Sequence, residues 1–203
     1  MATQGSLFRY FQLPHSFSTY RRDPPHSCDL CGRVRPGYAG PFYGPGNEDF
    51  VCEQCLIAGR LAERGMTTNT GDAVALREQL AVLSPESESE RLEELVRERT
   101  AELEERTPHI VSWQDWAWPA HCGDYARFEG EVGQPDLIQL APDGDGRRFF
   151  LDHLYDFREG TDPGTWETIR PDSPTDMAIS YSTAVYLFRC LHCGEHLTVW
   201  DCD

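Results

Sequence analysis

A helical pattern of apolar residues runs from residue 84 to residue 108. The residues that recur at helical spacing are Leu92, Leu95, Val96, Arg99 and Leu103. Most positions between them are charged, so we expect one long helix with an apolar stripe and a solvated acidic face. Ser84 or Ser87 can cap this helix, Pro85 fits its first turn, and Pro108 ends it.

The chain before this helix carries shorter patterns. Residues 6–13 are rich in aromatic side chains and predict a short strand. Residues 56–65 and 73–83 predict helices, and Gly65 suits the C-cap of the first.

The chain after residue 124 changes to a β-rich pattern. The predicted strands lie at 125–133, 136–142, 177–190 and 196–203. Residues 143–157 predict a turn followed by a strand or a short helix. Residues 160–176 predict a long acidic loop, because proline and glycine interrupt any regular pattern there.

Four cysteines in the first third of the chain form two C-x-x-C pairs. They are Cys28, Cys31, Cys52 and Cys55. Two close thiolate pairs suit a tetrahedral Zn²⁺, and Gly32 permits the positive φ that such a knuckle needs. The Gly- and Pro-rich segment between the pairs can form a β-hairpin, and the second pair opens a helix whose N-terminus favours thiolates. This order predicts a treble-clef-like zinc unit. Four cysteines leave no open coordination position, so a structural role is expected in preference to a redox or iron–sulfur one.

A third C-x-x-C pair lies near the end of the chain and needs partners from elsewhere. It consists of Cys190 and Cys193, followed by Gly194. Cys122 is the other cysteine within the body of the chain, and the adjacent His121 can complete a Cys₃His site. We therefore expect a second Zn²⁺ at these residues. The alternative is a buried free cysteine beside a packed histidine.

The fourth ligand of this second site has several candidates besides His121. They are His192, His196 and Cys202. Asp124 can accept a hydrogen bond from a ligand histidine, although a plain loop carboxylate is the simpler interpretation. If water held the fourth position, the site could be catalytic, with Asp124, Asp201 or Glu195 as base.

Three tryptophans flank this second site. Trp113, Trp116 and Trp118 can pack in the core around the metal or form a stacking platform for bases. Base stacking needs neighbouring positive charge, and this stretch has almost none. Core packing is therefore the preferred interpretation.

Composition and charge narrow the class of partner. The chain of 203 residues carries 34 acidic and 18 basic residues, a formal charge of -16, and every basic residue is arginine. A polyanion such as DNA is repelled by this acidic surface, so we do not expect nucleic-acid binding. We expect a basic protein partner instead. No apolar window is long enough to span a membrane and no secretion signal is present, so we expect a cytoplasmic protein with reduced thiols.

Together these patterns predict an α+β fold in which a central acidic helix joins two zinc-bearing units. The expected segments are a treble-clef-like unit at 1–66, a helical segment at 67–110 and a β-rich unit at 111–203. We expect the three to form one compact domain, stabilised by two Zn²⁺ ions.

Motifs along nearly the whole chain follow a known order. They are LFRYFQLP at 7–14, CxxCGRVRPGYAGPFY at 28–43, CxxCLIAG at 52–59, RTPxxxxWQ at 106–114, WxxHCGD at 118–124, ARFEGEVG at 126–133 and YLFRCLHCG at 186–194. In these motifs the chain resembles the CbrC family of bacterial proteins. It departs from that family at Glu53 and Gln54, where proline and tryptophan are usual, and in its long acidic stretch at 143–176.

The resemblance implies that seven cysteines bind zinc. It implies no particular enzymatic activity. The implied ligands are Cys28, Cys31, Cys52, Cys55, Cys122, Cys190 and Cys193. The family label refers to tolerance of an E-type colicin, a nuclease toxin. The resemblance therefore implies a possible role in tolerance or immunity to a protein toxin.

Four functions are consistent with the sequence. The first is a binding protein for a basic toxin, with contact surfaces at 86–106 and 143–176. The second is a zinc-dependent enzyme at Cys122, Cys190 and Cys193, which is not expected because thiolate-rich sites are normally closed and structural. The third, a nucleic-acid-binding zinc finger using Arg33 and Arg35, is opposed by the charge. The fourth is a stress-linked adaptor of unknown partner.

Overall fold

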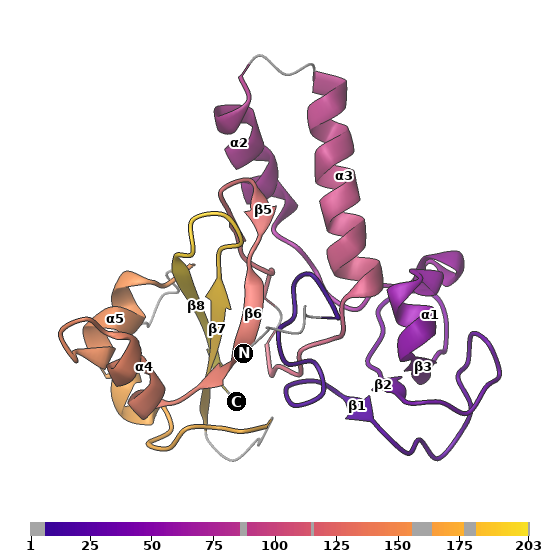
Figure 1. The fold of residues 1–203 in the computed structure, drawn as a ribbon, viewed down its shortest axis with the longest axis horizontal. Coiled ribbons are helices and arrows are strands. Elements are labelled where there is room, and N and C mark those ends of the chain that lie inside the picture. Colours follow the sequence, from indigo (N-terminus) through magenta and orange to yellow (C-terminus); the bar gives the residue numbers. More distant parts are fainter. Residues whose placement is uncertain (1–6, 86–88, 115, 156–163, 177–181, 203) are drawn as a thin grey trace, which may run out of the picture.

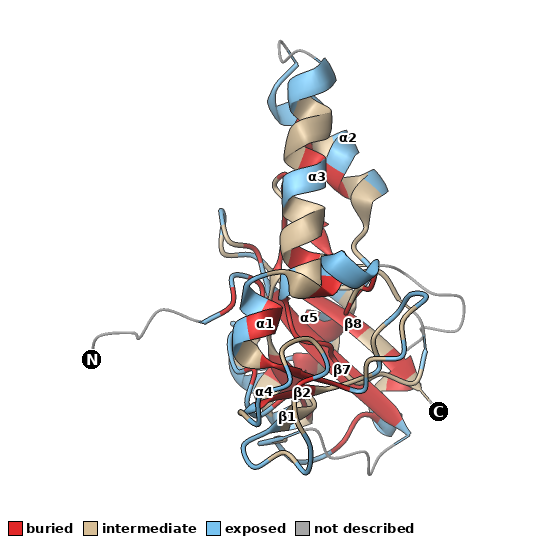
Figure 2. Ribbon diagram, turned by 90° about the vertical axis from the view of Figure 1, so that its right-hand side faces the viewer, coloured by how far each residue is buried: buried red, intermediate tan, exposed pale blue. Residues whose placement is uncertain are grey.

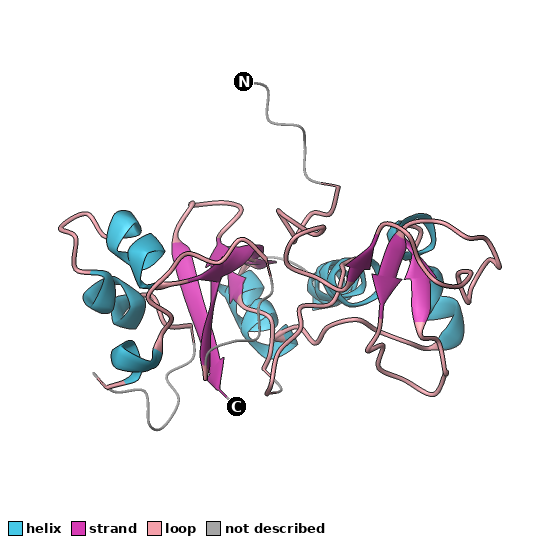
Figure 3. Ribbon diagram, turned by 90° about the horizontal axis from the view of Figure 1, so that it is seen from below, coloured by secondary structure: helices cyan, strands magenta, loops and turns pink. Residues whose placement is uncertain are grey.

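A computed structural model describes residues 7–85, 89–114, 116–155, 164–176 and 182–202. It has a mixed helix and sheet architecture, as the sequence predicts. One small sheet lies at each side of the molecule, and a helical hairpin rises from the junction between them (Figure 1). The view from below separates the two sheets clearly (Figure 3).

The N-terminal sheet has three short antiparallel strands in the order β1-β2-β3. They are β1 (Tyr20–Arg21), β2 (Gly37–Ala39) and β3 (Phe50–Cys52). Strands β2 and β3 form the predicted hairpin between the first two cysteine pairs, with Gly37 opposite Cys52. Helix α1 (Glu53–Ile57) follows β3 directly.

The helix predicted at 56–65 is two elements. Helix α1 ends at Ile57, and a 3₁₀ helix, η1 (Arg60–Arg64), follows. Gly59 between them has a left-handed conformation with φ of 68°, which an α-helix cannot continue through. Gly65 ends η1 in the same conformation, as predicted for the C-cap.

The helical hairpin consists of α2 (Ala73–Leu83) and α3 (Ser89–Arg106). Helix α2 has the predicted bounds, and its cap is Asp72, which accepts a hydrogen bond from the Ala75 N–H. Ser84 does not cap the acidic helix as proposed, because it is the C-cap of α2 and Pro85 lies in the following turn. The other proposed cap, Ser87, lies outside the described residues.

Helix α3 has the amphipathic character that its pattern predicts. Val96 and Leu103 are buried, and the helix ends at Arg106, two residues before Pro108. Much of the outer surface of the hairpin is exposed, in contrast to the buried sheets beneath it (Figure 2).

The C-terminal sheet has three longer antiparallel strands in the order β6-β7-β8. They are β6 (Arg127–Val132), β7 (Thr183–Arg189) and β8 (His196–Cys202). Strands β6 and β8 match the predictions closely. Strand β7 confirms the second half of the strand predicted at 177–190, whose residues 177–181 lie outside the described part. A two-stranded ribbon, β4 (Ala120–His121) with β5 (Asp124–Tyr125), precedes the sheet.

The strand predicted at 136–142 is wrong: these residues belong to helix α4 (Gln134–Leu140). The helix has Pro135 in its first turn, and the Asp136 carboxylate accepts a hydrogen bond from the Gly133 N–H at 2.9 Å. Leu137 is buried against the sheet core. The apolar residues Leu137, Leu140 and Ala141 also recur at helical spacing, so the local sequence favours the helix.

The other uncertain C-terminal segments resolve as short helices. Residues predicted to be a strand or short helix form α5 (Gly146–Asp152), capped by Asp145. The predicted loop at 160–176 contains a 3₁₀ turn, η2 (Thr165–Thr168), while its first residues lie outside the described part. Helices α4 and α5 cover the outer side of the C-terminal sheet (Figure 1).

The aromatic segment at 6–13 is not a strand in its described residues. Phe8, Tyr10 and Phe11 are all buried, but the backbone forms a turn at residues 9–10 between isolated bridges at Phe8 and Phe11. The segment turns on itself and touches β6 through isolated bridges, with Gln12 donating to the Phe128 carbonyl at 2.9 Å.

One cluster of buried side chains spans both halves of the molecule. It contains Cys28, Tyr38 and Leu56 from the N-terminal unit and Trp118 and Phe188 from the C-terminal half. A smaller cluster lies between β7 and the helices α4 and α5. The three proposed segment boundaries stay a prediction.

Two candidate metal centres

The first candidate centre joins the knuckle before β2 to the start of α1. Its residues are Cys28, Cys31, Cys52 and Cys55, whose sulfurs all lie within 4.8 Å of one another. The Sγ atoms of Cys31 and Cys52 are 3.8 Å apart, although 20 residues separate them in the chain. The arrangement can hold one metal ion with four sulfur ligands.

The backbone around the first cysteine pair forms a closed turn. The Cys28 N–H donates to the Arg33 carbonyl at 2.9 Å, and the Gly32 N–H donates to the Cys28 carbonyl at 2.7 Å. Gly32 has φ of 69°, as the knuckle prediction requires. Asp29 inside this turn ties it to β3, because its N–H donates to the Phe50 carbonyl at 3.0 Å and its carboxylate accepts from the Phe50 N–H at 2.8 Å.

The second pair lies at the N-terminus of α1. Cys52 is the N-cap residue, and Cys55 lies in the first turn. Arg60 brings Nη1 within 3.6 Å of the Cys55 sulfur, so a cation offsets part of the charge that thiolates would bring. The treble-clef-like order of knuckle, hairpin and helix is therefore present.

The surroundings of the four thiols shift their pKa values in different directions. Burial raises the pKa of Cys55 to about 12 and also raises that of Cys52. A backbone hydrogen bond at Arg33 lowers the pKa of Cys31 to about 7. Buried thiols of high pKa stay protonated unless a cation replaces their protons, and a divalent metal is such a cation.

The second candidate centre joins the β4–β5 ribbon to the tip of the β7–β8 hairpin. Its residues are His121, Cys122, Cys190 and Cys193, again with ligand atoms within 4.8 Å of one another. The Cys193 sulfur lies 3.5 Å from Nδ1 of His121. The structure thus brings together four predicted residues from two distant parts of the chain.

Cys122 occupies a backbone conformation that is rare for its residue type. It has φ of 53° and Gly123 has φ of 73°, so both central residues of the β4–β5 turn are left-handed. Such two-residue turns normally use asparagine and glycine. A cysteine held there points to a functional constraint on the side chain.

The turn is held in place from α2. The Gln79 side chain accepts from the Gly123 N–H at 3.0 Å and donates to the Ala120 carbonyl at 2.9 Å. The left-handed φ of Gly123 favours glycine, and a Cβ there would also displace the ends of the Leu83 and Leu80 side chains, at 2.9 Å and 3.0 Å. The helical hairpin therefore positions the second centre.

The knuckle at Cys190 repeats the hydrogen bonds of the first one. The Cys190 N–H donates to the Glu195 carbonyl at 2.8 Å, and the Gly194 N–H donates to the Cys190 carbonyl at 3.2 Å. Gly194 has φ of 79°. Both C-x-x-C-G motifs thus form the same local structure, which explains why both were visible in the sequence.

The alternative fourth ligands lie elsewhere. His192 directs Nε2 to Asp124 at 3.2 Å, and His196 directs Nε2 to Glu129 at 3.8 Å. The Cys202 sulfur accepts from the Gln114 side chain at 3.4 Å. Among the described residues, His121 alone joins the three cysteines, while its coordination of a metal stays a prediction.

The two centres differ in exposure. Cys28, Cys52 and Cys55 are buried, whereas Cys193 is exposed and His121 and Cys122 are partly exposed. Burial and neighbouring thiols raise the pKa of Cys122 to about 11, while a backbone hydrogen bond at Glu195 lowers that of Cys193. The second centre is therefore the one that solvent can reach.

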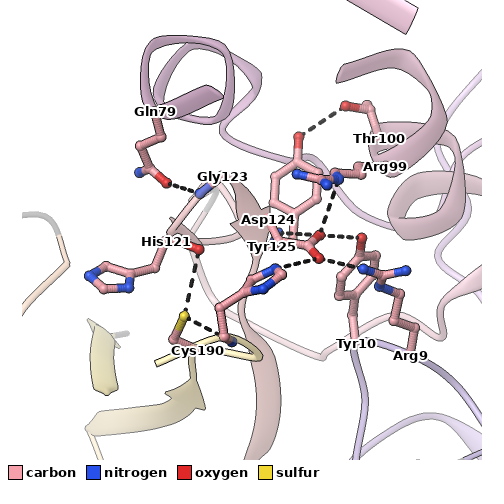
Figure 4. A network of polar contacts seen from close by, with 11 residues as sticks. Arg9, Tyr10, Gln79, Arg99, Thr100, His121, Gly123, Asp124, Tyr125 and Cys190 are labelled. Atoms are coloured by element: carbon pink, nitrogen blue, oxygen red, sulfur yellow. Dashed lines mark hydrogen bonds and ion pairs between the residues drawn. The ribbon is translucent and has the colours of Figure 1, made fainter. Parts of the chain in front are cut away.

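Asp124 has a larger role than the sequence indicated. It is fully buried and accepts hydrogen bonds from Arg9, from the Tyr10 hydroxyl at 2.8 Å and from its neighbour's N–H (Figure 4). Arg99 of α3 and His192 also approach it, at 3.8 Å and 3.2 Å. Burial opposes its ionisation, but the hydrogen bonds from Tyr10 and Arg9 outweigh burial and lower its pKa.

This carboxylate connects the N-terminal segment, α3, the β4–β5 ribbon and the second knuckle. Because it follows the Cys122 turn directly, the network holds that turn against the rest of the molecule. Its partners come from positions 9, 10, 99 and 192, so no spacing in the sequence could reveal it.

The tryptophans of this region pack in the core. Trp118 is buried, contacts Phe128 and Phe188 edge-on, and donates its indole N–H to the Ala126 carbonyl at 2.7 Å. Trp113 and Trp116 are partly buried against the same cluster. This agrees with the preferred interpretation.

Comparison with known proteins gives a match over almost the whole chain. The model of the uncharacterised protein family UPF0167 matches residues 6–202. A UPF0167 protein of Mycobacterium tuberculosis and one of Mycobacterium bovis are each 30% identical over 200 residues, covering 96% of this chain and 91% of theirs. A UPF0167 protein of Pseudomonas aeruginosa is 28% identical over 195 residues, covering 93% of this chain and 92% of its own.

No solved structure matches the chain. Among the helices of the described residues, none has the length and apolar character needed to cross a membrane.

Proposed function

This chain belongs to the uncharacterised protein family UPF0167, and we propose that it is a zinc-stabilised binding protein that presents an acidic helix to a basic protein partner. The single observation that carries the proposal is the pair of closed four-ligand clusters, which supply rigidity without an evident reactive position. The acidic surface then supplies the recognition.

Zinc is the metal that suits both donor sets. Four cysteines, or three cysteines and one histidine, are typical of structural Zn²⁺ sites. Sulfurs at ~2.3 Å from one tetrahedral ion lie roughly 3.8 Å from each other. The Cys31 to Cys52 separation of 3.8 Å fits that geometry. When bound, the ions would hold the two knuckles to α1 and to the β4–β5 ribbon.

Four protein ligands at each centre favour a structural role over catalysis. A catalytic zinc keeps a position for water or substrate. We therefore propose no enzymatic activity, and we place the protein in the cytoplasm, where its eight free cysteines would stay reduced.

Helix α3 is the proposed contact surface. It stands out from the body of the molecule, and its exposed carboxylates include Glu90 and Glu98 (Figure 2). With a formal charge of -16, the protein would attract a basic partner over distances of about a Debye length.

The resemblance to the CbrC family suggests one class of partner. We take that family and UPF0167 to be the same group, and we propose that the partner is a basic toxin such as a nuclease domain. Binding would then confer tolerance or immunity by covering the toxin.

The test is binding of basic nuclease domains to the zinc-loaded protein at low and high salt. We expect a triple variant, Glu90→Gln with Glu98→Gln and Glu105→Gln, to lower the association rate at least tenfold at low salt. A matched control, Asp23→Asn with Asp49→Asn and Glu63→Gln, removes the same charge at exposed positions outside both 86–106 and 143–176 and should have a smaller effect. Equal effects of the two variants, or an association rate independent of salt, would reject α3 as the contact surface.

A further inference from the structure

A cavity of about 490 Å³ lies between the N-terminal unit and the segment that follows α3. Its wall includes Tyr43, Asn69, His109, Ser112, Trp116 and Trp118. None of the lining residues belongs to either metal cluster. The volume is in the range of small-molecule sites, roughly 300–1,000 Å³.

The aromatic walls of this cavity are fixed by the backbone. Tyr43 exchanges two backbone hydrogen bonds with Thr67, both at 2.8 Å. The Trp118 N–H donates to the Thr70 carbonyl at 2.7 Å, and the Trp116 ring centre lies 6.3 Å from that of Trp118. The cavity is therefore formed before any ligand arrives.

Two polar groups of the lining are left unused by the fold: the indole N–H of Trp116, which is buried without a hydrogen-bond partner in the described part of the chain, and the imidazole of His109. His109 is 7% exposed, and its Nδ1 lies 2.8 Å from the Thr68 carbonyl. A carbonyl can only accept, so Nδ1 carries the proton and the neutral ring offers a lone pair at Nε2. Among the described residues, no group forms a hydrogen bond with Nε2.

The support of His109 makes its orientation rigid. The Thr68 N–H donates to the Glu104 carbonyl at 2.7 Å, and the Asn69 side chain donates to the carbonyls of Thr107 and Pro108. The Tyr43 ring lies edge-on to the imidazole at 5.6 Å. Burial lowers the pKa of His109, which keeps the ring neutral near pH 7.

Within the residues that the structure describes, the lining contains no acidic residue and no arginine. A charged ligand would thus lose its hydration without gaining a counter-charge. Aromatic walls favour a flat molecule, and the free lone pair favours one with an N–H or O–H group.

We propose that this cavity binds an uncharged heteroaromatic molecule of one or two fused rings, which packs between Tyr43 and Trp116 and donates a hydrogen bond to Nε2 of His109. This site is independent of the proposed partner of α3. It also needs no metal chemistry, because neither cluster lines it.

The test uses two probes of nearly the same shape and the intact metal-loaded protein. Indole carries an N–H donor, and benzofuran has an oxygen in its place. Calorimetric titration should show indole binding at least tenfold more tightly than benzofuran. No binding of indole, or equal affinity for the two probes, would overturn the proposal without any variant.

A substitution at His109 then tests whether the ligand donates its hydrogen bond to this residue. His109→Asn keeps a donor for the Thr68 carbonyl and removes the Nε2 lone pair, so it should weaken indole at least tenfold and leave benzofuran unchanged. His153→Asn is the matched control, because His153 also directs Nδ1 to a backbone carbonyl, that of Phe149 at 2.7 Å, and does not line the cavity. If the His109→Asn protein folds and binds indole as tightly as the unaltered protein does, the ligand does not donate a hydrogen bond to Nε2 of His109 and the proposal is rejected.

Discussion

Cys122 shows how one residue can combine a strained backbone with a chemical role. Its φ of 53° costs a non-glycine residue about 1–2 kcal/mol relative to an ordinary turn. Asparagine or glycine would adopt this turn more easily, but neither provides a thiolate. If the Cys122 sulfur binds a metal together with Cys190 and Cys193, the metal adds far more to the free energy of unfolding than the backbone strain subtracts.

Cys122→Ser should reduce the metal content from two zinc ions per chain to one. Serine cannot replace a thiolate ligand, whereas the four-cysteine centre is untouched. Metal content is measured by elemental mass spectrometry on protein purified under reducing conditions. Cys202→Ser is the control and should keep both ions, because Cys202 lies outside both clusters. Two ions in the Cys122→Ser protein would mean that this residue is no ligand.

In the α2–α3 hairpin, a buried apolar contact and an exposed ion pair both hold the helices in place, and their contributions to stability differ. Leu103 is completely buried where the hairpin meets the body, while Arg77 and Glu93 form an ion pair across the hairpin at 2.7 Å with both side chains nearly half exposed. Burial of apolar area outweighs an exposed ion pair, because water competes for the charges and salt screens them. The hairpin is therefore held at its base.

Leu103→Ala should lower the free energy of unfolding by about 2–5 kcal/mol, since it leaves a cavity in the shared core. Arg77→Ala should lower it by less than about 1 kcal/mol, despite the well-formed ion pair. Urea denaturation of the zinc-loaded proteins gives both values. A loss for Arg77→Ala as large as that for Leu103→Ala would show that the ion pair, and not the core, holds the hairpin.

At the scale of the whole molecule, one shared core connects the two sheets, and each half contains one candidate metal centre. The first centre is closed within the N-terminal unit, whereas the second ties the C-terminal hairpin to the ribbon beside α2. Structural zinc sites contribute roughly 10–16 kcal/mol to folding in small domains. Loss of the ions should therefore affect the fold as well as the sites.

A strong chelator should remove the metal in two phases, the second centre first, because Cys193 is exposed and the first centre is mostly buried. Zinc release is followed with a colour-forming chelator, and tertiary structure with the near-ultraviolet signal of the tryptophans. The faster phase should be missing in Cys122→Ser, which identifies its origin. A metal-free protein that still unfolds cooperatively at the same temperature would refute a structural role for zinc.

Features formed by interactions between residues close in the chain could be predicted from the sequence. The two C-x-x-C-G knuckles form by backbone hydrogen bonds within six residues, and α2 has both the predicted bounds and a cap at Asp72. The helix at 134–140 was also readable from Pro135 and Asp136, which the strand prediction at 136–142 did not take into account. The segment at 6–13 failed because its aromatic residues are buried by contacts with β6 and not by strand alternation.

Other features depend on contacts that no spacing encodes. The distant partners of Asp124 come from three parts of the chain, and the lone pair of His109 faces a cavity whose wall is built from two units. Burial and pairing of such groups are properties of the assembled fold. They had no signal in the sequence.

The sequence by itself determined the two knuckles, the acidic helix and the overall mixture of helices and sheets, because short-range backbone geometry and apolar periodicity produce them. Only the tertiary structure decided that His121, and not His192, His196 or Cys202, stands beside the three distant cysteines. Proximity between far-apart residues follows from how the β4–β5 ribbon, α2 and the β7–β8 hairpin pack together. That packing is a cooperative result of the whole core.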